Sequence, residues 1–164
     1  MTSWVALLRG VNVGGHHRVP MAELVEMVSG LGFQRVRSYI QSGNLVFEAD
    51  DAGPLEPALR ARFGVRVVVR SAAEMAGVLE RNPFGPEHTH VVFLDRDPAP
   101  AALEPDRSPG DAFVVSGREV YLNCPNGLAR CKLSIDWFER KLKVQATCRN
   151  WNTVLKLADM AGRG

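Results

Sequence analysis

The feature of this sequence that most constrains its fold is an order of predicted elements that occurs twice. A boundary rich in proline and glycine, residues 82–86, divides the 164-residue chain. Strands and helices follow in the order βαββαβα on each side of it. The repeated order predicts two related halves, residues 1–82 and residues 83–164, of which the second ends in a helix.

Hydrophobic periodicity defines the elements of the first half. The apolar residues 4–8 predict a strand, and apolar residues at i, i+3, i+4 and i+7 from Met21 predict an amphipathic helix after Pro20. Two short apolar runs flank Ser42-Gly43-Asn44, where glycine and asparagine suit a tight hairpin turn. The remaining predicted elements are a helix over about 54–63, a strand over 65–69 and a helix that begins with a capping box at Ser71 and Glu74.

The second half repeats this pattern. Its predicted elements are a strand over 90–94, a short proline-interrupted helix near 99–105, a hairpin over 113–122, a helix over 135–142, a strand over 144–148 and a final helix from about 150–153. The order βαββαβ is typical of ferredoxin-like α-β plaits, in which helices pack on one face of an antiparallel sheet. We therefore predict an α+β protein built from two ferredoxin-like units.

Four separated motifs point to a known family. They are residues 6–15 (ALLRGVNVGG), 39–44 (YIQSGN), 82–84 (NPF) and 146–154 (ATCRNWNTV). In these motifs the chain resembles the domain-of-unknown-function 1697 (DUF1697) family of bacterial proteins. The resemblance implies a pair of α-β plaits and no particular activity. The chain departs from the family at two positions. It has His16 where the family commonly has lysine, and Cys131 where the family commonly has serine.

Composition predicts a soluble cytoplasmic protein. No apolar run approaches the roughly 20 residues of a membrane-spanning helix, and no basic leader precedes the first apolar run. The three cysteines, Cys124, Cys131 and Cys148, are an odd set without CxxC spacing, so we expect small buried side chains rather than a disulfide framework. The histidines at 16–17 and 88–90 have no partner at regular metal-site spacing, and we predict no metal site.

The first candidate site is the glycine-rich connection after the first predicted strand. Arg9, Asn12, Gly14 and Gly15 belong to it, and such a connection before a helix can turn several backbone N–H groups toward one anion. Its spacing matches neither GxGxxG nor GxxxxGK[ST]. The alternative is a tight crossover in which the glycines adopt unusual backbone angles.

The second candidate site lies at the start of the last predicted helix. Arg149, Asn150 and Asn152 offer a guanidinium and two amides at the positive end of the helix dipole, where a phosphate or carboxylate would be stabilised. Alternatively, one asparagine caps the helix while Trp151 packs in the core. Residues 130–164 carry eight Lys/Arg against three Asp/Glu. This excess fits either an electropositive face or ordinary solubilising charge.

These candidates favour binding of an anionic ligand, which is a nucleotide, a phosphorylated metabolite or a nucleic-acid backbone. One alternative is a small-molecule enzyme with a pocket between the halves, where Arg9 and Arg149 orient the substrate and His17 transfers protons. Another is a protein-interaction module. RNA bound on a sheet would need exposed rings. The candidates for these rings are Tyr39, Phe47, Phe113 and Tyr121.

Overall fold

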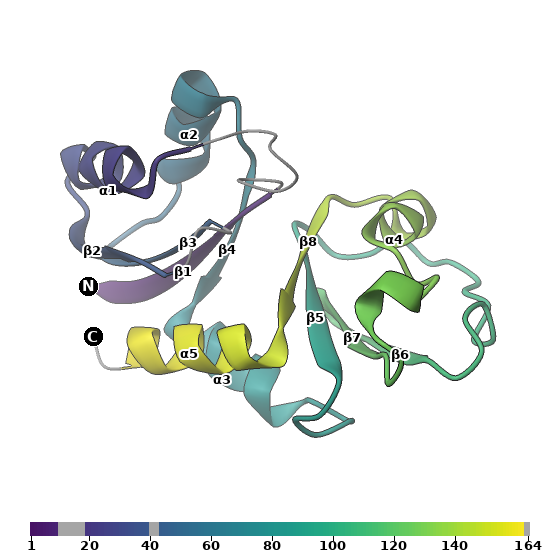
Figure 1. The fold of residues 1–164 in the computed structure, drawn as a ribbon. Coiled ribbons are helices and arrows are strands. Elements are labelled where there is room, and N and C mark those ends of the chain that lie inside the picture. Colours follow the sequence, from purple (N-terminus) through teal and green to yellow (C-terminus); the bar gives the residue numbers. More distant parts are fainter. Residues whose placement is uncertain (10–18, 40–42, 163–164) are drawn as a thin grey trace. The chain divides into compact units, whose positions relative to one another are not determined.

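The computed structural model of the protein describes residues 1–9, 19–39 and 43–162. Along the chain its elements are β1 (Thr2–Leu8), α1 (Met21–Gly30), β2 (Gln34–Ser38), β3 (Asn44–Ala49), α2 (Leu55–Phe63), β4 (Val67–Ser71), α3 (Ala72–Glu80), β5 (Thr89–Leu94), β6 (Ala112–Ser116), β7 (Glu119–Asn123), the 3-10 helix η1 (Leu128–Arg130), α4 (Ile135–Leu142), β8 (Ala146–Asn150) and α5 (Trp151–Gly162) (Figure 1).

Two four-stranded antiparallel sheets form the framework. Their strand orders are β2-β3-β1-β4 and β6-β7-β5-β8. The two orders are identical when the strands of each half are counted from its own first strand. The predicted α+β fold, with antiparallel sheets in two similar halves, is therefore confirmed.

The chain divides into two compact units. Unit 1 comprises Met1–Gly77 and Lys156–Gly164, and unit 2 comprises Val78–Leu155. Helices α3 and α5 each begin in one unit and end in the other. The predicted halves, 1–82 and 83–164, follow the sequence repeat, and the limits of the compact units differ from them.

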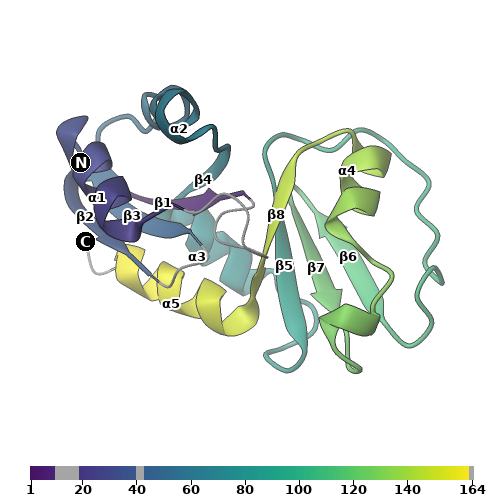
Figure 2. The same ribbon diagram turned by 45° about the horizontal axis from the view of Figure 1, so that its top comes forward.

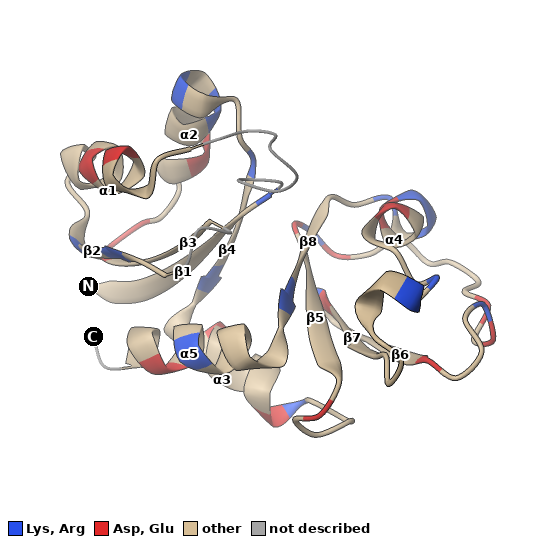
Figure 3. Cartoon of the chain, viewed as in Figure 1, with Lys and Arg blue, Asp and Glu red and all other residues tan. Residues whose placement is uncertain are grey.

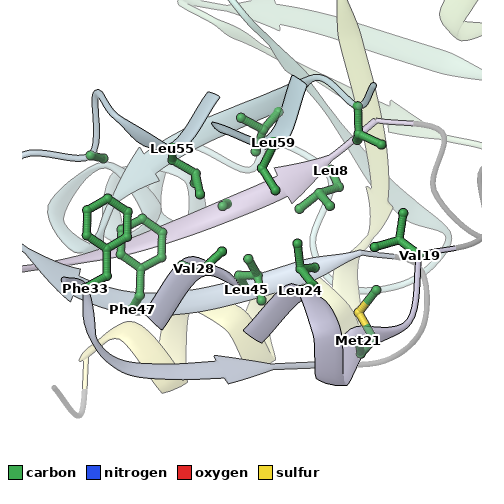
Figure 4. Close-up of a cluster of buried hydrophobic side chains, with 14 of the residues drawn as sticks. Leu8, Val19, Met21, Leu24, Val28, Phe33, Leu45, Phe47, Leu55 and Leu59 are labelled. Carbon is green, nitrogen blue, oxygen red and sulfur yellow. The ribbon is translucent and has the colours of Figure 1, made fainter. Parts of the chain in front are cut away.

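The core of unit 1 forms where α1 and α2 cover one face of its sheet (Figure 1; Figure 4). Alternate strand residues point to the same face, so Leu8 from β1 and Leu45 from β3 meet Leu24 of α1 in one buried cluster. Phe47 extends this cluster and stacks on Phe33, with ring centroids 4.7 Å apart. The apolar periodicity predicted from Met21 thus produces the buried face of α1.

The core of unit 2 is covered differently. Helix α4 packs on the sheet (Figure 2) and contributes Trp137 and Phe138. Their rings meet edge to face, with ring centroids 4.9 Å apart. Phe113 from β6 contacts both rings. Ser134 caps α4 because its hydroxyl accepts a hydrogen bond from the Trp137 backbone N–H at 3.2 Å.

The helix predicted near residues 99–105 is wrong. Between β5 and β6 the chain has no helix, and Pro98, Pro100 and Pro105 lie in this segment. Proline lacks the backbone N–H that a helix interior requires. The loop instead packs against the aromatic core of its own unit, where the Arg107 guanidinium lies 4.6 Å from the centroid of the Trp137 ring. An extended loop therefore stands in unit 2 where α1 stands in unit 1.

The capping box at the start of α3 is confirmed. The Ser71 hydroxyl accepts from the Glu74 N–H at 3.1 Å, and the Glu74 carboxylate accepts from the Ser71 N–H at 2.8 Å. None of the helices in the described part combines the length and apolar character needed to cross a membrane.

We expect Phe47→Ala to lower the free energy of unfolding by about 3–5 kcal/mol, because it removes a fully buried ring and leaves a cavity in the unit 1 core. Urea denaturation measures the change. The control is Val114→Ala on β6, where the side chain is 40% exposed and the expected loss is below about 1 kcal/mol. Equal losses in the two variants would contradict this account of the core.

Candidate functional site

The glycine-rich candidate site lies mostly outside the described residues. Asn12, Gly14 and Gly15 fall in that part of the chain, as do the two histidines at 16–17. Arg9 is described at the end of β1, where its backbone N–H donates to the Arg66 carbonyl at 2.9 Å and its side chain is half-buried. The anion-binding role of this connection stays a prediction.

The second candidate site coincides with a pocket in unit 2. The cavity has a volume of about 280 Å³. Its lining residues are Pro86, His88, Thr89, His90, Asn150, Trp151 and Asn152. The register of the sheet explains why residues so far apart in the sequence line one pocket, because His90 in β5 pairs directly with Asn150 in β8. Side chains at directly paired positions lie on the same face of the sheet.

The NPF motif shapes one wall of this pocket. The Asn82 side-chain amide donates to the Gly85 carbonyl at 2.8 Å, and its carbonyl oxygen accepts from the Phe84 N–H at 2.9 Å. The Thr89 hydroxyl donates to the same Gly85 carbonyl at 2.8 Å. These bonds fasten the loop before β5. His88 follows with a φ of 62°, a left-handed conformation that is uncommon for a residue other than glycine.

The start of α5 supplies the other lining residues of the pocket, together with Asn150 at the end of β8. The Asn150 side-chain oxygen accepts from the Thr153 N–H at 2.8 Å, which confirms that this asparagine caps the helix. Trp151 is buried, as expected for a core residue, whereas Asn152 is exposed at the pocket. Asn150 therefore fills the capping role and lines the pocket as well.

Arg149 lies on the other face of the sheet. Successive strand residues alternate between faces, so Arg149 and Thr147 point away from Asn150. Its guanidinium donates to the Thr147 hydroxyl at 2.6 Å and to the Cys148 carbonyl at 2.9 Å. Burial lowers the pKa of Arg149 to about 10, so it stays charged at neutral pH. The structure thus brings Asn150 and Asn152 to one pocket and places Arg149 outside it.

The repeat supplies a counterpart of Arg149. In unit 1, Arg70 of β4 pairs with Val5 of β1, and in unit 2 Arg149 of β8 pairs with Val91 of β5. Both arginines are buried. Each stands directly before the residue that caps the next helix, which is Ser71 in unit 1 and Asn150 in unit 2. A buried arginine at this position is therefore part of the duplicated framework.

His90, which lines the pocket, has a ring nitrogen that lacks a hydrogen-bond partner in the described part of the chain. Its Nδ1 atom is buried and has no hydrogen-bond partner among the described residues. Buried polar atoms normally have such a partner. Burial also lowers the pKa of His90 below its usual value, which keeps the imidazole neutral at pH 7. The sequence suggests this histidine only as a metal ligand, because its strand partner Asn150 lies 60 positions away along the chain.

The aromatic rings considered for RNA do not form an open platform. Phe47 and Tyr121 are fully buried. The Tyr121 hydroxyl donates to the Val78 carbonyl at 2.7 Å, and Phe113 packs on the aromatic residues of α4. Because bases stack on exposed rings, the structure contradicts the use of Phe47 and Tyr121 for RNA binding.

Comparison with known proteins supports the fold. A family model described as "Protein of unknown function (DUF1697)" matches residues 1–121. A similar solved structure is that of the conserved bacterial protein SP0830 from Streptococcus pneumoniae, with a TM-score of 0.65 and 24% sequence identity over 98% of each chain. No match was found among curated proteins.

We expect acid to destabilise the ligand-free protein partly through His90. The pKa of His90 in the folded protein lies below the usual value of 6.5. As pH falls through this value, the unfolded chain therefore binds more protons than the folded chain, and the free energy of unfolding decreases. Replacement by glutamine, His90→Gln, should reduce the drop in melting temperature between about pH 8 and about pH 5.5. An unchanged drop in this variant would show that other groups carry the dependence.

Proposed function

The chain belongs to the DUF1697 family, and from the pocket at the start of α5 we propose that it binds a small ligand carrying a phosphate group. The observation that carries this proposal is the convergence of two imidazoles and two carboxamides on the first turn of a helix. The N-terminus of a helix favours anions, because its free N–H groups and its dipole are directed at the ligand.

The charge and size of the pocket support a small anion. None of its lining residues is acidic, so a phosphate would meet no repulsion from them. A volume of about 280 Å³ lies near the lower end of the range for small-molecule sites. The pocket therefore suits a phosphorylated metabolite, or one phosphate group of a nucleotide.

A nucleic-acid backbone is the weaker candidate. Lysine and arginine are spread over several elements, among them α2 and α4, rather than gathered along one (Figure 3). A protein that tracks a nucleic-acid backbone usually presents a continuous basic surface. The described residues favour a discrete phosphate over a polymer.

His90 makes the proposed binding depend on pH. A phosphate beside the imidazole would favour its charged form and raise its pKa in the complex. The complex would then hold more protons at His90 than the free protein does, and this contribution favours tighter binding as pH falls from about 8 toward about 6. This direction is opposite to the effect of acid on the ligand-free protein.

The test is a thermal-shift titration with inorganic phosphate, pyrophosphate and nucleoside phosphates. A ligand at about 100 times its Kd stabilises a folded protein by about 2.7 kcal/mol. We expect Asn152→Asp to abolish the shift, because it places a negative charge at the pocket. Aspartate is favourable in the first turn of a helix, so the variant should fold normally.

The matched control is Asn126→Asp, the same change at an exposed turn residue of unit 2 that does not line the pocket. This variant should keep the full shift. If Asn152→Asp binds phosphate as the original chain does, or if both variants lose binding equally, the pocket is not the site.

We also infer that each half is a ferredoxin-like unit and that the protein is cytoplasmic. The first inference is supported by the shared strand order of the two sheets. The second is supported by three cysteines that form no disulfide, as is usual in a reducing compartment.

A further inference from the structure

Unit 2 brings together three potential metal ligands that lie apart in the sequence. A carboxylate oxygen of Asp111 and the sulfur atoms of Cys124 and Cys131 all lie within 4.8 Å of one another. We propose that these three residues bind a thiophilic divalent cation, for which zinc is the best match. Thiolate and carboxylate are both established zinc ligands, and the proposal is independent of the phosphate pocket.

The two cysteines are brought together by consecutive turns. Cys124 follows β7, and its backbone N–H donates to the His88 carbonyl at 3.0 Å. A turn closed by the Gly127 N–H on the Cys124 carbonyl leads into η1, after which the Cys131 N–H donates to the Leu128 carbonyl. The chain thereby returns on itself, and the two sulfur atoms lie 2.9 Å apart.

Ser108 holds the third ligand in place. Its hydroxyl donates to Asp111 Oδ2 at 2.6 Å and accepts from the Lys132 N–H at 3.0 Å. This one side chain therefore links the carboxylate to the residue that follows Cys131. Hydrogen bonds of this kind to a ligating carboxylate are typical of metal sites, where they orient the ligand.

Asp111 also has a carboxylate oxygen without a hydrogen-bond partner in the described structure, which a cation could bind. Its Oδ1 atom is buried and has no hydrogen-bond partner among the described residues. A buried carboxylate oxygen without a partner is costly. A divalent ion bound by Asp111 and both thiolates would satisfy this oxygen and compensate the negative charges.

A zinc site accounts for this cluster better than a disulfide does. A disulfide would leave Asp111 Oδ1 without a partner. Zinc displaces the thiol proton when it binds. With Zn–S distances of about 2.3 Å, a tetrahedral ion holds its sulfurs about 3.8 Å apart, so the two sulfur atoms must move apart from their separation of 2.9 Å when the ion binds.

The cluster borders a cavity that provides access for the ion. Cys131 lines a cavity of about 290 Å³ together with Leu122, Leu133 and Cys148. Water from this cavity can occupy the fourth position around the ion, as in zinc sites that have three protein ligands. Cys148 lies on the wall of the cavity and is not one of the three clustered ligands.

The test uses the full chain, reduced and freed of metal by a chelator, and zinc ion alone as the probe. We expect one zinc ion per chain by atomic absorption after dialysis, and a higher melting temperature in zinc. Cobalt should give a thiolate-to-metal absorption band. Cys131→Ser and Asp111→Asn should each weaken zinc binding at least tenfold, and their metal-free melting temperatures report whether they fold.

Cys148→Ser is the matched control, because it removes a thiol from the same cavity and should leave zinc binding unchanged. The proposal is overturned if the reduced chain binds no zinc, or if Cys131→Ser and Cys148→Ser bind it equally. It is also overturned if peptide mapping of the chain, purified without reductant, finds Cys124 linked to Cys131 and the reduced form takes up no metal.

Discussion

The register of β5 against its two neighbours controls where the polar side chains that line the unit 2 pocket meet. β5 lies between β7 and β8, and its pairing with β8 sets His90 opposite Asn150. A shift by one residue would move every side chain of the strand to the other face of the sheet. The apolar residues Val92 and Leu94, buried in the unit 2 core, oppose such a shift and hold the pocket at the start of α5.

The two faces of this sheet have different roles. The face that carries Val92 and Leu94 also carries His90 and Asn150, so the core and the pocket share it. The other face carries Arg149, whose counterpart in unit 1 is the equally buried Arg70. A charged group that recurs in both units at the same sheet position is better explained by the architecture than by a ligand specific to unit 2.

The main difference between the units lies in the segment after the first strand of each sheet. Unit 1 has α1, which buries an apolar face, whereas unit 2 has a proline-containing loop that packs on Trp137 through Arg107. Because this loop is not helical, its end can place Ser108 and Asp111 beside the turn that carries Cys131. The loss of a helix in the repeat thus coincides with a cluster that unit 1 does not have in its described residues.

The sequence by itself determined the features that depend on neighbouring residues. The periodicity from Met21, the capping box at Ser71 and the repeated order of elements were sufficient to predict the α+β duplication, because periodicity and capping act within a few positions. It also singled out Asn150 and Asn152, which the structure places at one pocket. Only the tertiary structure decided that His90 joins them, that Arg149 does not, and that Asp111 lies beside Cys124 and Cys131. These contacts depend on strand register and loop closure over long stretches of chain, for which no local pattern exists.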